Sequence, residues 1–404
     1  MNAPRQACIV GLGETAYVKR GQATEPEYRL AMQAILAAAA DAGMPPTDID
    51  GLATFADERS GQSNLAADLG IDELRFAATC AIPGGGGGCG AVAEATLAVE
   101  TGMADTVVVY RSLCQGQFYR IGRGMAPRQP QTPASPLAES ALENEALQAF
   151  SAPFGVLGPS IAFALRMRRH MEVFGTTGEH LAHVAVTERG YALSNPRAVM
   201  AGKPLTIADH QASRMVADPY RLFDCCLETD GACAVVVTTA DRAAGLAQTP
   251  IEILAVAQGT HGGNLGGALM HARSTADDYA TGGGRDVARR LYGKAGIGPG
   301  DIDVAQLYDN FTGQVLLGLE DFGFCGPGES GPFVAEGGLS PTGPLPTNTS
   351  GGNLSEAYMQ GLNQVIEGVR QLRGQSSSQV GSPEVCLVTS SPAMPTSAIV
   401  MARP

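Results

Sequence analysis

The sequence predicts an α/β protein built from two duplicated α/β halves. Residues 42–50 read AGMPPTDID and residues 295–303 read AGIGPGDID, with six of nine positions identical at an offset of 253. Each copy follows a helix-like segment and precedes a short apolar run. Alternating helices and strands favour largely parallel pairing, with helices on both sheet faces. We therefore expect a layered architecture.

The segments around the repeat give the first elements of each half. Glycine stops a helix, proline opens a turn, and an Asp-flanked apolar run begins a strand. The first half is expected to have a helix over 27–43 and a strand over 51–55. The second half is expected to have a helix over 283–298 and a strand over 304–308.

A second correspondence follows in the same order. In the first half, the glycine loop 84–88 leads into a helix over about 89–102 and the strand 106–110. In the second half, SGG at 350–352 leads into a helix over about 355–373, and the strand 385–389 closes the chain. Two correspondences in one order indicate a duplication.

The predicted boundary between the halves lies near 245–250, in AGLAQTP. This gives an N-terminal half over 1–247, with a loop insertion at about 115–215, and a C-terminal half over 248–404. The stretch 115–157 is irregular and carries three arginines, at positions 120, 123 and 128. A long loop of this kind is a candidate contact for acyl-CoA phosphates, a partner surface or a solvated loop.

Composition excludes several classes of function. A net charge of −13 argues against a nucleic-acid partner, because phosphate binding depends on Lys and Arg. The chain has no apolar run of about 20 residues and no apolar leader, so we expect no membrane span and no secretory signal. The nine cysteines lack the paired spacing of a zinc site, so we expect no metal and reduced thiols in a cytoplasmic protein.

The glycine-led helices are the first candidate binding elements. Helix N-termini favour negative charge through their free N–H groups and the helix dipole. Gly85 and Gly86 in the first half, and Gly351 and Gly352 in the second, are therefore candidate donors to an oxyanion or enolate. The alternative is that these glycines serve only tight packing of helix on sheet.

Two motifs of the second half carry the candidate catalytic groups. LYDNFTG follows the repeated strand, and NTSGGNLSEAYMQG heads the second glycine-led helix. They place Tyr308 at a strand end and Tyr358 at a helix start, where α/β folds carry functional groups. Asp309 and Asn310 are catalytic candidates or ordinary turn residues. His261, in QGTHGGN, is a substrate-binding candidate or a surface histidine.

These motifs resemble the thiolase superfamily, in the branch of sterol-carrier-protein thiolases and lipid-transfer proteins. Where that branch has His-Asp-Cys-Phe-Thr, this chain has YDNFT at 308–312; where it has Gly-Gly-x-Leu-Ser-x-Gly-His-Pro, this chain has GGNLSEAYM at 351–359. The resemblance implies a five-layer αβαβα sandwich. It also implies that two tyrosines replace both catalytic histidines, that Gly85 stands at the position of the nucleophilic cysteine, and that SSPAMP at 390–395 lacks the second cysteine.

The SEAY sequence resembles the steroid side-chain-cleaving aldolases of the same superfamily. That resemblance implies retro-aldol cleavage of a branched β-hydroxyacyl-CoA, from a steroid or bile-acid side chain, to a ketone and a short acyl-CoA such as propionyl-CoA or acetyl-CoA. It further implies a homodimer and a small acyl-CoA-binding partner with an OB fold and a zinc ribbon. No cofactor is expected on this chain, since coenzyme A arrives with the substrate.

The chemistry fits these residues, and two alternatives stay open. Retro-aldol cleavage needs acid–base groups and an enolate site but no covalent acyl-enzyme. A tyrosine of ordinary pKa near 10 is a poor base, so it must be activated, act through its neighbour or serve as the acid. The alternatives are a thiolase or acyltransferase using a displaced Cys89 or Cys80, and a non-catalytic acyl-CoA- or lipid-binding subunit.

Overall fold

The computed structural model describes residues 5–56, 58–82, 84–117, 152–156, 158–259, 283–391 and 396–404. Within them, ten strands form one sheet, in the order β10-β11-β12-β9-β1-β8-β5-β3-β4, with β2 paired to β8. The strands of this sheet are β1 (Ala7–Glu14), β2 (Val18–Lys19), β3 (Gly51–Phe55), β4 (Phe76–Cys80), β5 (Thr106–Cys114), β8 (Thr229–Thr239), β9 (Ile251–Gly259), β10 (Val304–Gln306), β11 (Val385–Thr389) and β12 (Thr396–Ala402).

Helices cover this sheet on both sides. They are α1 (Glu27–Ala42), α2 (Gln62–Leu69), α3 (Gly88–Thr101), α5 (Pro159–Phe174), α6 (Gly178–Leu193), α7 (Ile207–Ala212), α8 (Ala240–Ala243), α9 (Arg285–Ala295), α10 (Thr312–Asp321), α11 (Ser330–Ala335) and α12 (Leu362–Arg373). A separate hairpin pairs β6 (Met215–Ala217) with β7 (Tyr220–Arg221).

The sheet consists of one topology used twice. The strands of the first half lie in the order β1-β8-β5-β3, and those of the second in the corresponding order β9-β12-β11-β10. Corresponding pairs also agree in direction, since β8 and β12 are each antiparallel to both of their long neighbours. The two parts of the sheet join where β1 pairs β9 through Cys8–Glu252 and Ile9–Ile251.

The prediction of largely parallel pairing was wrong. Parallel pairs are β3 with β4, β3 with β5, and β10 with β11, whereas the other long pairs are antiparallel. In the second half the reason is chain length, because only residues 390–395 join β11 to β12 and a parallel crossover needs about a dozen residues. The sequence led us to expect that strand 385–389 closes the chain, but β12 follows it.

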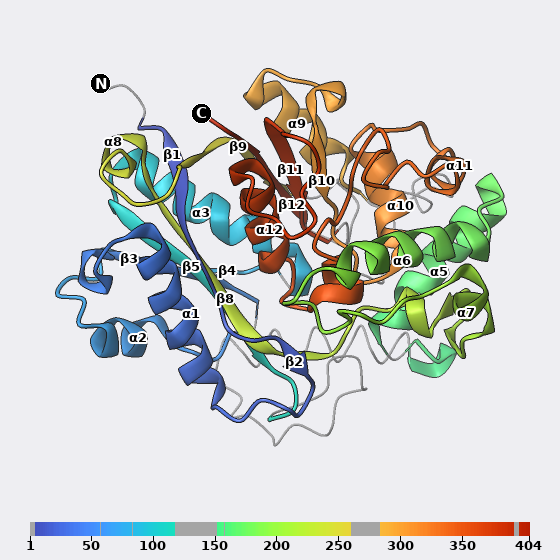
Figure 1. Ribbon diagram of the computed structural model, residues 1–404, viewed down its shortest axis with the longest axis horizontal. Coiled ribbons are helices and arrows are strands. Elements are labelled where there is room, and N and C mark those ends of the chain that lie inside the picture. Colours follow the sequence, from blue (N-terminus) through green and yellow to red (C-terminus); the bar gives the residue numbers. More distant parts are fainter. Residues whose placement is uncertain are drawn as a thin grey trace.

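The layers place two helices at the centre. Figure 1 shows α3 and α12 between the two parts of the sheet, and α3 contacts β3 and β5 on one side and β9 and β12 on the other. Helix α1 covers the outer face of the first part by packing on β1, β5 and β8. Helix α9 covers the outer face of the second part, on β9 and β12. This is the five-layer αβαβα arrangement expected from the sequence.

The repeated motif has the same structural role in each half. Asp50 accepts hydrogen bonds from the N–H groups of Asp105 (2.9 Å) and Thr106 (2.8 Å), at the start of β5. Asp303, its counterpart in the second copy, accepts from the N–H groups of Glu384 (2.8 Å) and Val385 (2.9 Å), at the start of β11. The aspartate shared by the two copies thus fixes the register of the neighbouring parallel strand.

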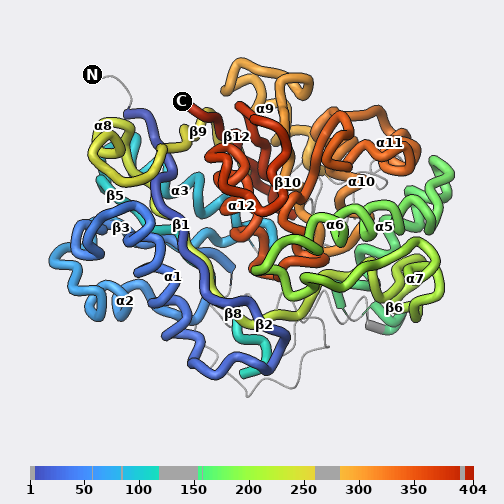
Figure 2. Tube along the Cα trace, viewed as in Figure 1, coloured from blue at the N-terminus to red at the C-terminus, as the bar shows by residue number. Residues whose placement is uncertain are grey.

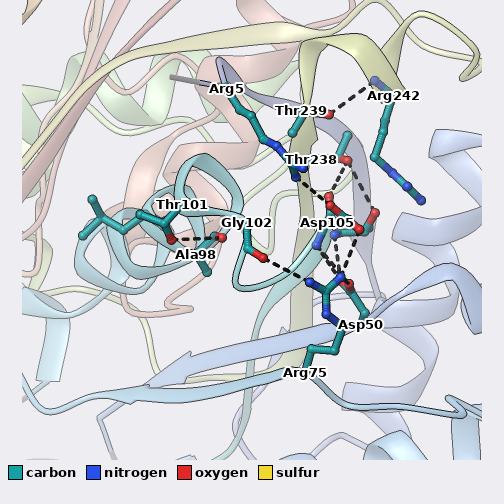
Figure 3. A network of polar contacts seen from close by, with 12 residues as sticks. Arg5, Asp50, Arg75, Ala98, Thr101, Gly102, Asp105, Thr238, Thr239 and Arg242 are labelled. Carbon is teal, nitrogen blue, oxygen red and sulfur yellow. Dashed lines mark hydrogen bonds and ion pairs between the residues drawn. The ribbon is translucent and has the colours of Figure 1, made fainter. Parts of the chain in front are cut away.

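Ion pairs strengthen this corner of the first half. Figure 3 shows Arg75 between Asp50 (2.9 Å) and Asp105 (3.0 Å), while Arg5 reaches Asp105 at 2.7 Å. The Arg5 hydrogen bond, with Arg75 adding to it, lowers the pKa of Asp105. These pairs join the start of the chain to the beginnings of β3, β4 and β5.

The predicted loop insertion at 115–215 is largely helical in its second part. Helices α5, α6 and α7 lie within it, and α6 packs against α10 and α11 of the second half. Figure 1 shows α5, α6 and α7 together at one side of the molecule, beyond the second part of the sheet. The three arginines at 120, 123 and 128 lie outside the described residues.

The two ends of the described chain lie side by side. Cys8 in β1 and Ala402 in β12 both pair with Glu252 of β9, from opposite sides. Figure 2 shows the two traces running close together at this point. Among the described helices, none combines the length and apolar character that crossing a bilayer requires.

Candidate active site

Tyr308 lies just beyond the end of β10 and is almost completely buried, with 1% of its surface exposed. Its backbone N–H donates to the hydroxyl oxygen of Thr389, the last residue of β11, at 3.1 Å. The tyrosine is therefore fixed by the neighbouring parallel strand, as predicted from its position after an apolar strand.

Tyr358 lies in the same site as Tyr308 but does not follow a strand. The predicted helix over 355–373 is wrong at its start, because a π-helical turn covers Gly352–Glu356 and α12 begins only at Leu362. Tyr358 lies in the connection between them. Thr229, the first residue of β8, holds it: the Thr229 hydroxyl accepts from the Tyr358 N–H at 3.0 Å and donates to the Tyr358 carbonyl at 3.2 Å.

The two tyrosine hydroxyls meet. The Tyr308 hydroxyl donates to the Tyr358 hydroxyl at 3.1 Å. Burial, followed by the neighbouring Tyr358, raises the pKa of Tyr308 well above its ordinary value, and burial also raises the pKa of Tyr358. Hydrogen bonds from Tyr308 and from the Gln360 side chain partly oppose the rise in the pKa of Tyr358. Both hydroxyls are therefore protonated at neutral pH.

Gly85 lies against the tyrosine pair from the other half of the chain. It is in a short 3₁₀ turn, Gly84–Gly86, immediately before α3. A Cβ atom built on Gly85 would overlap the hydroxyl and ring of Tyr308, so the tyrosine fills the space that a side chain at this position would need. A nucleophile at position 85 and the Tyr308 side chain in this position are mutually exclusive.

The glycine carbonyls beside Tyr308 are fixed by the second half. The Gly85 carbonyl accepts from the Ser391 N–H at 2.9 Å, and the Gly86 carbonyl accepts from the Ser397 hydroxyl at 2.6 Å. The loop that precedes α3 is therefore joined to the segment around β12, and it reaches the tyrosine pair as part of a rigid junction between the halves.

Gly351 and Gly352 do not present free amides. The Gly351 N–H donates to the Asn348 carbonyl at 2.9 Å, and the Gly352 N–H points to the Ser350 hydroxyl at 3.4 Å. Their positive φ angles, 106° and 57°, explain why glycine is needed. Both N–H groups thus have acceptors inside the turn, and the binding of an enolate by these two residues stays a prediction.

Asp309 makes its hydrogen bonds with the surrounding backbone and amide side chains, and not with the hydroxyls of Tyr308 and Tyr358. Its buried carboxylate accepts from the Asn353 amide (2.8 Å), the Leu354 N–H (2.9 Å) and the Gln364 amide (2.8 Å). Burial raises the pKa of Glu188, and the neighbouring Asp309 adds to that rise. Asp309 thus ties the π-helical turn to α12, and its catalytic role stays a prediction.

Asn310 keeps an unused polar atom beside the pair. Its backbone carbonyl accepts from the Cys226 N–H at 3.0 Å. Its side-chain Oδ1 is buried and has no hydrogen-bond partner among the described residues. Asn310 thus keeps a buried acceptor without a described partner, two residues after Tyr308. His261, the remaining predicted substrate contact, lies outside the described residues.

The two candidate cysteines are buried in the packing. The Cys89 thiol contacts the Val388 carbonyl at 3.5 Å, and burial raises its pKa to about 12. Burial raises the pKa of Cys80 to about 11. Because the thiolate is the nucleophile, neither residue is suited to attack a thioester at neutral pH.

Thr229, Thr389 and Gln360 were not predicted. The two threonines belong to strands distant in sequence from the tyrosines, and nothing in their local sequence marks them. The only sequence feature that could have indicated Gln360 is its position in the motif, two residues after Tyr358. Its backbone has φ of +52°, which is uncommon for a residue other than glycine.

Comparison with known proteins defines the family. Residues 266–402 match the family described as thiolase C-terminal domain-like. A 17-hydroxy-3-oxo-4-pregnene-20-carboxyl-CoA lyase of Mycobacterium tuberculosis is 43% identical over 396 residues, which is 98% of this chain and 99% of that protein. The chain belongs to the thiolase superfamily.

Two further similarities place it within the superfamily. A steroid side-chain-cleaving aldolase of Thermomonospora curvata is 40% identical over 398 residues, or 98% of each chain. A solved structure of an Ltp2-ChsH2(DUF35) aldolase superposes with a TM-score of 0.88 and 37% identity, over 99% of this chain and 98% of that one. The predicted family and thiolase fold are confirmed.

Proposed function

We propose that this thiolase-superfamily protein is a carbon–carbon lyase that performs retro-aldol cleavage of a branched β-hydroxyacyl-CoA derived from a steroid side chain. The observation that carries the proposal is the tyrosine pair in the space that a side chain at position 85 would occupy. The similarity to two aldolases of steroid side-chain cleavage over nearly the whole chain supports the substrate class.

The chemistry requires one proton to move and one bond to break. The β-hydroxyl loses its proton and becomes the ketone carbonyl, while the Cα–Cβ bond breaks and its electron pair forms the thioester enolate. Protonation of the enolate at Cα then gives the short acyl-CoA, propionyl-CoA or acetyl-CoA. No net proton, oxidant or covalent acyl group is needed, so the absence of a nucleophile at position 85 fits the reaction.

Tyr308 and Tyr358 have different roles in this proton transfer. Tyr358 accepts from Tyr308, so its oxygen is the better place for developing negative charge. Because both hydroxyls are protonated, we assign Tyr358 to relay the proton: it gives its own proton to Cα of the enolate and takes up the β-hydroxyl proton, so that it ends protonated, and Tyr308 supports it. Asn310 Oδ1 lies available to orient the ligand.

The test separates lyase from thiolase by its requirement for free coenzyme A. The full chain with its partner should convert a β-hydroxyacyl-CoA to equal amounts of ketone and short acyl-CoA without added coenzyme A. The matched β-ketoacyl-CoA, which a thiolase cleaves only with free coenzyme A, should not react. Cleavage of the keto substrate with coenzyme A, and none of the hydroxy substrate, would contradict the proposal.

The assembly proposed is a homodimer that binds a small acyl-CoA-binding partner with an OB fold and a zinc ribbon. The similar solved structure names a second component, ChsH2(DUF35), beside its aldolase, and this supports the partner. Strand β4 supports the dimer, because it ends the sheet order and pairs only β3 among the described strands. An open edge favours pairing with another chain. Sedimentation of the chain alone and with the partner tests both, and a fully active monomer would contradict the dimer.

No cofactor is proposed on this chain, and a cytoplasmic location is proposed from its thiols. All nine cysteines lie in the described part of the chain, and they are free there. Reduced cysteines are typical of a reducing compartment.

A further inference from the structure

Gln360 combines three features in one buried residue. Only 3% of its surface is exposed, and its Oε1 has no hydrogen-bond partner among the described residues. Its backbone lies in the left-handed region, at φ +52°, although it is not glycine. An unpaired buried acceptor and a strained backbone both cost stability, and such costs concentrate at functional sites.

The surroundings fix this residue in place. Gly361 follows it with φ of +92°, and Gly88 lies so close that a Cβ there would be 3.1 Å from the Gln360 carbonyl oxygen. The turn that holds Gln360 is therefore clamped between the start of α3 and the start of α12. A side chain held in this way loses little freedom when it binds a ligand.

Gln360 lies beside the tyrosine pair. It follows Tyr358 by two residues, and a Cβ built on the next residue, Gly361, would lie 3.1 Å from the Tyr308 ring. Its Oε1 is a buried acceptor without a partner among the described residues. An acceptor needs a donor, and at the reacting centre of a β-hydroxyacyl thioester the β-hydroxyl is the group that donates. The thioester carbonyl and the product ketone only accept.

We infer that Gln360 is a substrate-binding residue whose Oε1 accepts a hydrogen bond from the β-hydroxyl of the bound substrate. This inference rests on the proposed function and adds the residue that recognises the alcohol. Gln360 thereby selects hydroxylated acyl chains over otherwise identical chains that lack the hydroxyl, because the latter leave Oε1 unpaired.

The test uses ligands that cannot be cleaved. In a pair of coenzyme A thioethers, a methylene replaces the thioester carbonyl, so no enolate forms; one carries the alcohol and the other lacks it. Calorimetry with the full chain should show that the wild type binds the alcohol about tenfold more tightly, the scale of one net hydrogen bond. Gln360→Met, which keeps the length and loses the amide, should bind both ligands like the deoxy compound.

Two further variants make the result decisive. Gln360→Asn keeps an amide and tolerates a positive φ, but it is one carbon too short, so it should fold and also lose the preference. Gln314→Met changes another buried glutamine, on α10, and should keep the wild-type preference. Circular dichroism and melting curves verify that each variant is folded.

The outcomes separate this inference from the proposed function. A Gln360→Met protein that still prefers the alcohol tenfold, or a wild type without any preference, overturns the role of Gln360 even if the enzyme cleaves its substrate. A wild type that prefers the alcohol through Gln360 but releases no ketone from the β-hydroxyacyl-CoA supports the role of Gln360 and overturns the lyase.

Discussion

The Tyr308 side chain occupies the space next to Gly85 in which a side chain at that position would have to lie. The two residues come from different halves of the chain, and the position of one restricts the identity of the other. A tyrosine in this position requires glycine at 85, and glycine at 85 leaves no nucleophile. This relationship turns a site of covalent chemistry into a site of proton transfer.

Gly85→Ala should abolish most activity without a large effect on global folding. The added methyl group overlaps the Tyr308 hydroxyl and must displace the ring, so the hydrogen bond to Tyr358 is lost. We expect turnover to fall by roughly 10²-fold, the contribution of one positioned proton-transfer group. Gly190→Ala in α6 is the matched control, because nothing lies within 4 Å of a Cβ there. Equal turnover by both variants would show that the position of Tyr308 is unimportant.

Cys89→Ala should leave cleavage within about threefold of the parent rate. The thiol is buried, its pKa is raised to about 12, and no step needs it. Steady-state rates after treatment with iodoacetamide should agree with those of the variant. A fall in the cleavage rate of more than about 10²-fold in a folded variant would favour the thiolase alternative.

Thr229→Val should lower the turnover rate about tenfold with little change in KM. The variant removes both hydrogen bonds that hold the Tyr358 backbone, so the hydroxyl loses its position rather than its chemistry. Thr229→Ser restores the hydroxyl and should recover most of the rate. Thr96→Val, at a buried threonine within α3, controls for the change in polarity. Failure of serine to rescue the rate would assign Thr229 to packing alone.

The repeated aspartates predict unequal effects on stability. Asp50→Ala leaves two partly buried N–H groups without an acceptor and removes one of the two carboxylates that Arg75 binds, so we expect a loss of about 1–3 kcal/mol in the free energy of unfolding. Asp303→Ala should cost less than about 1 kcal/mol, because Asp303 is exposed and water can replace it. Denaturant unfolding of both variants measures the difference, and a larger loss at Asp303 would contradict this explanation of the repeat.

The sequence was informative where function depends on local patterns. The repeat predicted α1 and β3 almost to the residue, with Gly43 ending α1 in the left-handed conformation. The YDN and SEAY motifs predicted that Tyr308 and Tyr358 matter, and the structure brings their hydroxyls together. Both patterns consist of residues that lie close together in the chain.

The rest depends on contacts that no local pattern encodes. The helix predicted from 355 instead begins at Leu362, because Asp309 binds Asn353 and Leu354 and holds the preceding residues in a π-helical turn. The partners of the tyrosines, Thr229 and Thr389, come from strands that only the folded sheet brings near. The same tertiary bonds give Asp309 structural contacts that its local sequence does not reveal.

The most direct test of the account is single-turnover cleavage by Tyr358→Phe. The variant keeps the buried ring and removes only the hydroxyl that accepts from Tyr308. We predict that release of ketone and short acyl-CoA from the β-hydroxyacyl-CoA, with the partner present, falls by roughly 10²-fold or more, with modest change in substrate binding. Tyr308→Phe should also slow release, and the double variant should be less than additive. A Tyr358→Phe protein that cleaves at the parent rate would show that the tyrosine pair is packing and would contradict the account.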